Sequence, residues 1–134
     1  MSNEYKEWKK ERALELLNMV ESKLGVKVNV EIKESYYFGY SKSEDIIKIG
    51  KYQEDEVWYN LMRKHLWREY RFKIRELRED MEVFSFLHEL GHYFTKDIID
   101  ENVSYNSLPF FEYRMMAPEH AADEWAVNFM REYL

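Results

Sequence analysis

Two histidines four positions apart have the residue types and the spacing that metal chemistry requires. They stand in the run His88-Glu89-Leu90-Gly91-His92. On a helix both imidazoles would point the same way, because 3.6 residues per turn return the side chain to one face. Such a pair can hold a zinc ion at roughly 2.0–2.1 Å, with Glu89 placed to act as a general base. The pattern therefore predicts a zinc-dependent peptidase.

The residues around this motif are apolar, which suits a helix that runs through a core. A charged neighbour would be buried there without a partner, at a large cost in free energy. The other interpretation is a buried helix with two hydrogen-bonded core histidines. The flanking apolar residues are Phe84, Phe86, Leu87, Tyr93 and Phe94.

A second helix is predicted from Pro118 onward and supplies the third ligand. Proline suits the first turn of a helix, where its missing N–H costs nothing. Glu119 and Asp123 are four apart and share a face, so Glu119 can reach the metal while Asp123 accepts a hydrogen bond from a ligating imidazole. Ala121 and Ala122 are small and allow the two helices to approach closely. An apolar stripe follows at helical spacing: Ala122, Trp125, Ala126, Phe129, Met130 and Leu134.

Two alternatives remain open for this segment. Glu119 could belong to a solvated helix start, where acidic residues are favourable. His120 is a rival third ligand and would indicate the SprT-like enzymes that act on DNA-bound proteins. It points about 100° away from Glu119, so both cannot serve well. Glu119 has an acidic partner one turn further on, Asp123, which favours it.

The two motifs together resemble those of a known enzyme class. His88-Glu89-Leu90-Gly91-His92 followed by Glu-x-x-x-Asp is similar to the gluzincins, including the minimal ones. The closer resemblance is to the ImmA/IrrE-type metallopeptidases of bacteria, phages and mobile elements, and it covers residues 84–94 and 118–130. Their second motif, approximately Glu-x-x-Ala-Asn/Asp-x-aromatic-Ala, is matched by Glu119, Ala122, Asp123, Trp125 and Ala126.

This resemblance implies a fold, a cofactor and an activity. The fold is zincin-like, and one zinc ion is held by His88, His92 and Glu119, with Asp123 hydrogen-bonded to a ligating imidazole. Glu89 is the general base for a water molecule that the metal activates to hydrolyse a peptide bond. The substrate is a protein or peptide, and a regulatory protein such as a repressor is the expected target. The alternative function is a zinc-bearing, non-catalytic binding or inhibitor module of phage or mobile-element type.

Composition narrows the class of protein further. A chain of 134 residues is expected to form one domain, residues 1–134. Without cysteine it has neither disulfides nor thiol catalysis. The N-terminus has no apolar signal-peptide core and no run is long enough to span a membrane, so the cytoplasm is expected. A net charge of −6 argues against general affinity for nucleic acids.

The elements that must position the motifs indicate an α+β fold. Apolar spacing predicts a helix over residues 3–24, ended by Gly25. Strict alternation predicts a strand over 26–33, and two further strands are expected at 36–40 and 45–49. A three-stranded sheet would then precede the helix that carries the two histidines, and one edge strand could pair with an extended substrate.

The middle of the chain is predicted to be helical over residues 54–79 and is unusually basic. Between 63 and 78 its only acidic residues are Glu69 and Glu76. One interpretation is a docking surface for an acidic partner or a nucleic acid; the other is a solvated face whose long side chains cover aromatic neighbours. The basic residues are Arg63, Lys64, Arg68, Arg71, Lys73, Arg75 and Arg78.

Residues 96–117 are expected to form a long connection that passes near the metal. Such a connection could line or plug a substrate cleft. Three tyrosines are candidates for a hydroxyl that stabilises the oxyanion, and the sequence does not choose among Tyr93, Tyr105 and Tyr113.

Overall fold

Five α-helices and a three-stranded sheet make up the parts of the chain that the computed structural model describes, which are residues 2–36, 38–50, 56–74, 78–98 and 108–134. Side chains are described for these residues except 2–9, 56, 78 and 79. This arrangement confirms the predicted α+β class. In chain order the elements are α1 (Ser2–Leu24), β1 (Glu31–Glu34), β2 (Gly39–Ser41), β3 (Ile46–Ile49), α2 (Glu56–Tyr70), α3 (Arg78–Phe94), α4 (Phe110–Arg114) and α5 (Ala117–Tyr133).

The sheet has the order β1-β3-β2, so β3 is central and β1 and β2 form its edges. β1 pairs with β3 in parallel and β2 pairs with β3 in antiparallel fashion. The central position of β3 explains its composition, because Ile46, Ile47 and Ile49 are all buried. The three predicted strands are therefore present, each shorter than expected or shifted by a residue or more.

The alternating segment 26–33 forms a strand only at its end. Pairing with β3 begins at Glu31, opposite Ile46, and residues 26–30 precede it without strand pairing. Val28 is nevertheless buried, while Val26 is exposed. The alternation therefore marks a buried side chain at Val28 but not at Val26, and strand pairing begins only where β3 lies opposite.

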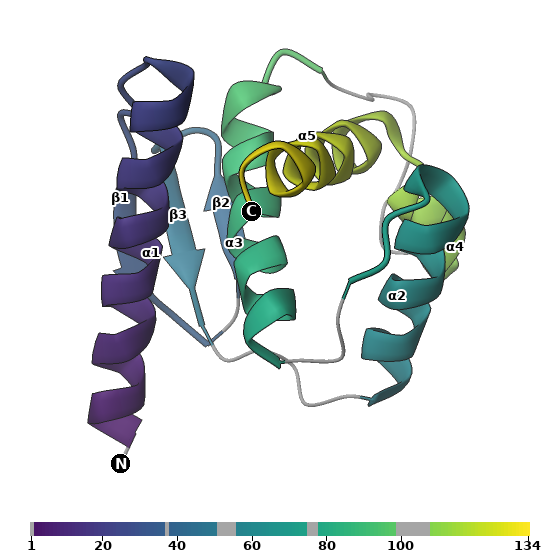
Figure 1. The fold of residues 1–134 in the computed structure, drawn as a ribbon, viewed down its shortest axis with the longest axis horizontal. Helices are drawn as coiled ribbons and strands as arrows, with labels where there is room; N and C mark the ends of the chain where they lie inside the picture. The colour runs from purple at the N-terminus through teal and green to yellow at the C-terminus, as the bar shows by residue number, and fades with distance from the viewer. Residues whose placement is uncertain (1, 37, 51–55, 75–77, 99–107) are drawn as a thin grey trace.

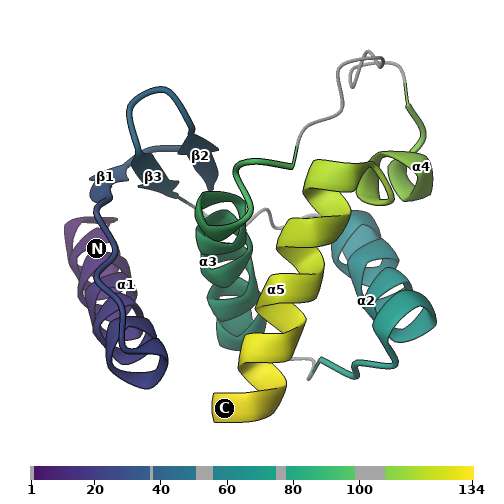
Figure 2. The ribbon, with the colours of Figure 1, turned by 90° about the horizontal axis from the view of Figure 1, so that it is seen from above.

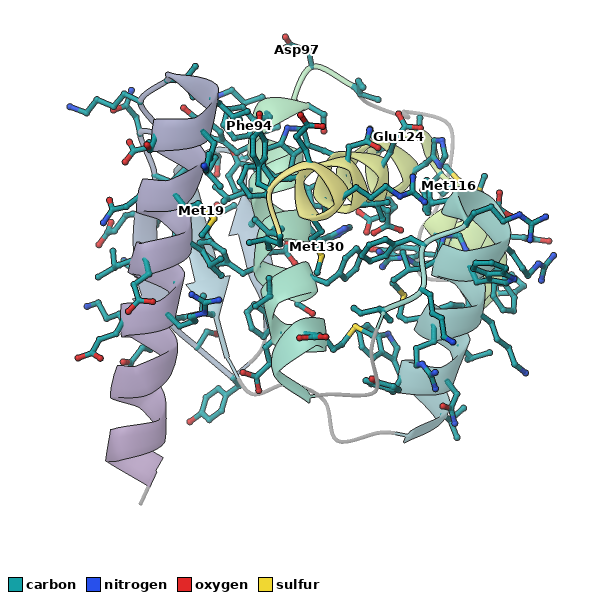
Figure 3. The ribbon with its side chains drawn as sticks, in the orientation of Figure 1. Met19, Phe94, Asp97, Met116, Glu124 and Met130 are labelled. Atoms are coloured by element: carbon teal, nitrogen blue, oxygen red, sulfur yellow. The ribbon has the colours of Figure 1, made fainter. Side chains whose placement is uncertain are left out.

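Helices α1 and α3 cover the same face of the sheet (Figure 2). Helix α1 does so with a stripe at helical spacing, Ala13, Leu16, Leu17 and Val20, all of which are buried. Met19 extends from the same helix toward α3 (Figure 3) and packs against the core.

Helix α3 lies at the centre of the molecule, between the sheet on one side and α5 on the other (Figure 1). It is buried around most of its circumference, and its apolar core residues are Met81, Val83, Phe84, Phe86, Leu87 and Leu90. The contact between α3 and α5 is the most extensive between any two elements of the described chain. The two predicted motifs therefore lie on helices that pack directly against each other.

Helix α5 begins with Pro118 in its first turn, as predicted, and its buried side includes Ala122, Ala126 and Phe129. The predicted stripe was wrong at its end, because Leu134 is about half exposed. Val127, outside the predicted stripe, is fully buried.

The prediction of one helix over residues 54–79 was wrong, because α2 ends at Tyr70. Arg71 adopts a left-handed backbone conformation with φ 51°. The N–H groups of Arg71 and Phe72 then bond to the carbonyls of Trp67 and Leu66, which closes the helix. A new helix, α3, begins at Arg78.

The expected long connection over 96–117 contains a short helix, α4, directly before α5. Figure 1 shows α4 beside α2, on the side of α5 away from the sheet. None of the helices in the described ranges combines the length and the apolar run needed to cross a bilayer.

Candidate metal centre

Helix α3 directs the imidazoles of His88 and His92 toward one point. Their Nε2 atoms lie 3.1 Å apart, and the two rings are nearly perpendicular, at 83°. His88 is buried, and His92 is partly exposed. The i, i+4 spacing thus has the predicted result, with one nitrogen from each ring facing the same small volume.

Glu119 enters this volume from the first turn of α5. Its Oε1 lies 3.2 Å from Nε2 of His88, and its Oε2 lies 3.0 Å from Nε2 of His92. Two ligands of a tetrahedral zinc site, each about 2.1 Å from the ion, stand roughly 3.4 Å from each other. The three side chains fit such a site closely and form a group that could hold a metal ion.

Asp123 holds the far side of the His88 ring. Its Oδ1 lies 2.7 Å from Nδ1 of His88, and its side chain is fully buried. A neutral His88 therefore carries its proton on Nδ1 and donates it to Asp123, which leaves the Nε2 lone pair turned toward Glu119 and His92. The predicted pairing of this carboxylate with an imidazole is present in the structure.

Glu89 is buried beside the pair of histidines. Burial raises the pKa of its carboxyl group, and the nearby imidazoles of His88 and His92 oppose that rise only in part. A carboxylate with a raised pKa is better matched to accepting and returning a proton near neutral pH. Its environment suits the general-base role expected from the motif.

The remaining titratable groups are coupled by ion pairs. Burial disfavours a charged His88, but the carboxylates of Asp123 and Glu119 outweigh it and raise the pKa of His88 to about 10. Burial likewise disfavours ionised Glu119 and Asp123. Hydrogen bonds from the two histidines lower the pKa of Glu119, and the charges of Arg114 and His88 lower that of Asp123, both to well below the usual range. Both carboxylates are therefore ionised at neutral pH.

Arg114 belongs to the cluster of buried groups formed by His88, Glu89, Glu119 and Asp123, and it was not predicted from the sequence. It projects from α4, is buried, and bonds to both oxygens of Asp123 through Nε, at 3.2 Å, and Nη2. Its Nη1 lies 3.6 Å from Oε1 of Glu119. The sequence held only an indirect sign of it: Glu119 and Asp123 were expected to face the core, and two buried carboxylates need a cation nearby.

His65 was also missed. This fully buried side chain of α2 lies with Nε2 3.6 Å from Oδ2 of Asp123, and that nitrogen has no hydrogen-bond partner among the residues that the structure describes. Rings of Tyr70, Phe110 and Phe111 surround it.

His120, the rival third ligand, turns away from the two histidines. Its Nδ1 lies 2.8 Å from the hydroxyl of Tyr70, and its Nε2 lies 3.8 Å from Glu124. Figure 3 shows Glu124 on α5 at the side toward α2 and α4. The group of side chains that could hold a metal contains Glu119 and not His120.

The three candidate tyrosines differ in their surroundings. The hydroxyl of Tyr93 accepts a hydrogen bond from the backbone N–H of Asn29. The ring of Tyr113 lies 6.0 Å from the guanidinium carbon of Arg114, while Tyr105 lies outside the described residues. Tyr113 therefore lies beside Arg114, and Tyr93 bonds to the segment that precedes β1.

The basic segment starts on α2 and continues past the end of that helix at Tyr70, and arginines on the helix cover aromatic rings. Arg63 lies over Tyr59, and Arg68 lies over Phe111. This is the arrangement expected for a solvated face whose long side chains cover aromatic neighbours. The same helix borders a hollow of about 530 Å³ lined by Asn60, Arg63, Lys64, Trp67, Lys73 and Ile74.

Comparison with protein-family models, curated proteins and solved structures found no significant match to this chain. The assignment of a function therefore depends on the geometry of the site and on the two motifs.

Proposed function

We propose that this protein is a zinc-dependent endopeptidase of the gluzincin type, with a zincin-like fold. The observation that carries the proposal is the convergence of His88, His92 and Glu119 from two packed helices, with the buried Glu89 beside them. Two neutral imidazoles and one carboxylate form the ligand set of several catalytic zinc sites, in which a fourth position is left for water or substrate.

Each residue of the site would have a separate role in peptide hydrolysis. A bound zinc ion would supply Lewis acidity, which polarises a peptide carbonyl and makes a water molecule more acidic. Glu89 accepts the proton of the attacking water and returns it to the leaving amine. Asp123 keeps His88 in the tautomer that presents Nε2, through the 2.7 Å contact to Nδ1.

The edge strand β2 is the surface on which we place the substrate backbone. Within the described parts of the chain, β2 pairs on one side only, with β3, which runs antiparallel to it. It also packs against α3. Tyr40 of β2 stacks on His92 with ring centroids 6.5 Å apart. An extended peptide added to this edge would form main-chain hydrogen bonds close to the two histidines.

A proteolysis experiment with Glu89→Gln tests the proposal. The wild-type protein is incubated with a lysate, and newly formed protein termini are mapped. Glu89→Gln keeps the shape of the side chain and all three metal ligands but loses the base. It should retain zinc and lose cleavage by at least roughly 10²–10⁴-fold. Glu82→Gln, which alters another buried carboxyl two turns earlier on the same helix, is the matched control and should cleave normally.

The same experiment distinguishes the alternative function. Wild-type cleavage that survives in Glu89→Gln would contradict the proposed mechanism. A wild-type protein that binds zinc and cleaves nothing would instead indicate a non-catalytic binding module. A regulatory protein is the substrate class that the resemblance implies, and the mapped termini identify it directly.

A further inference from the structure

Arg114 lies outside both motifs and yet reaches the two carboxylates that they contribute. We propose that Arg114 is a positioning residue of the metal centre, and that the affinity and geometry of the bound metal depend on its planar guanidinium. This inference rests on the proposed zinc binding and adds to it a residue from a third helix, α4.

The contact with Asp123 fixes that carboxylate at two points. Nε of Arg114 donates to Oδ2 at 3.2 Å, and Nη2 donates to Oδ1. Oδ1 also accepts from Nδ1 of His88, at 2.7 Å. A carboxylate held at both oxygens cannot rotate about its terminal bond, so the orientation of the His88 ring is fixed through Asp123. The fork of arginine donors matches this geometry, and a lysine ammonium does not.

The same guanidinium approaches the predicted ligand itself. Nη1 lies 3.6 Å from Oε1 of Glu119, the oxygen that faces Nε2 of His88 at 3.2 Å. Arg114 therefore spans two acidic side chains one turn apart on α5. It favours the orientation of Glu119 in which the carboxylate faces the two imidazoles.

Charge balance gives Arg114 a second reason to be buried. Among the described residues, the cluster holds three buried carboxyl groups, on Glu89, Glu119 and Asp123, and one permanent cation, Arg114. A divalent metal and one guanidinium together balance three carboxylates. Without the guanidinium, a loaded site would bury one uncompensated negative charge, which is costly in a low-dielectric interior.

Metal affinity and cobalt absorption spectra test this role. Metal-free wild type, Arg114→Lys and Arg114→Gln are titrated with zinc in competition with a chelator, and then loaded with cobalt(II). Arg114→Gln should bind zinc about 10–100-fold more weakly. Arg114→Lys should recover part of that loss because it keeps the charge, and the visible cobalt bands should shift in both variants. Arg12→Gln, on α1, removes a guanidinium away from the cluster and should match wild type in both measurements.

Circular dichroism and thermal melting of the metal-free proteins establish that each variant is folded. If Arg114→Gln does not fold, Arg114→Lys decides, through a measurable loss of zinc affinity and a shifted cobalt spectrum. Folded variants with the affinity and spectrum of wild type would overturn the role of Arg114 while leaving the proposed function intact. A wild-type protein that binds no zinc would overturn both.

Discussion

Gly91 of α3 lies directly against Ala122 of α5. A Cβ placed on Gly91 would stand 2.6 Å from the carbonyl oxygen of Ala122 and 2.9 Å from its Cα, both of them backbone atoms. His88 lies one turn before Gly91, and Glu119 lies one turn before Ala122. The close approach of the two backbones is therefore what brings these two predicted ligands together.

Gly91→Ala should destabilise the protein and open the site. The added methyl group would meet backbone that cannot move aside as a flexible side chain would, so the helices must separate. We expect a loss of about 1–3 kcal/mol in the free energy of unfolding, measured by chemical denaturation. Ser85→Ala, a small change at a half-buried position of the same helix, is the control. An unchanged stability in Gly91→Ala would show that the helices are not packed at this distance.

His120→Ala should bind zinc as the wild type does. The His120 ring is engaged by Tyr70 and lies outside the group that could hold a metal. His92→Ala, which removes the predicted ligand four residues after His88, should lose the metal. The metal content of the two purified variants, measured by mass spectrometry, shows which of the two histidines is a ligand. Loss of zinc in His120→Ala would restore that residue as the third ligand.

Removing the metal should lower the melting temperature. A ligand that binds only the folded state stabilises it by about 2.7 kcal/mol at a free concentration 100 times its dissociation constant. Thermal unfolding followed with and without a chelator measures this difference, and added zinc should reverse it. The His92→Ala variant provides the control, since its melting temperature should not respond to the chelator. A wild-type melting temperature that changes with neither the chelator nor added zinc would argue against a metal centre.

The basic segment, residues 63–78, should not make the protein a general DNA-binding protein. Several of its arginines lie over aromatic rings, and the net charge of the chain is −6. We expect no mobility shift of duplex DNA at physiological ionic strength. A shift that weakens steeply with salt, and that disappears when Lys64 and Lys73 are both replaced by glutamate, would assign a nucleic-acid role to this segment.

Where helical spacing alone brings side chains together, their arrangement could be predicted from the sequence. His88 and His92 follow helical geometry alone, and so does the shared face of Glu119 and Asp123. The helix start at Pro118 follows from the missing N–H of proline. In each case the periodicity of a single helix fixes which side chains lie together.

Features that the periodicity of a single helix or strand does not determine could not be predicted. Arg114 meets Asp123 only because α4 folds back beside the start of α5, and no periodicity links the two positions. The end of α2 at Arg71 has neither glycine nor proline to mark it, because an arginine adopts the left-handed conformation there. The length of β1 is set by its partner β3 and not by its own alternation.

The most direct test of the metal centre is a crystal structure of the zinc-loaded protein with data collected at the zinc absorption edge. We predict one anomalous peak per chain, about 2.0–2.2 Å from Nε2 of His88, Nε2 of His92 and a carboxylate oxygen of Glu119. A map without a peak between these atoms, with Glu119 turned away from both imidazoles, would contradict it.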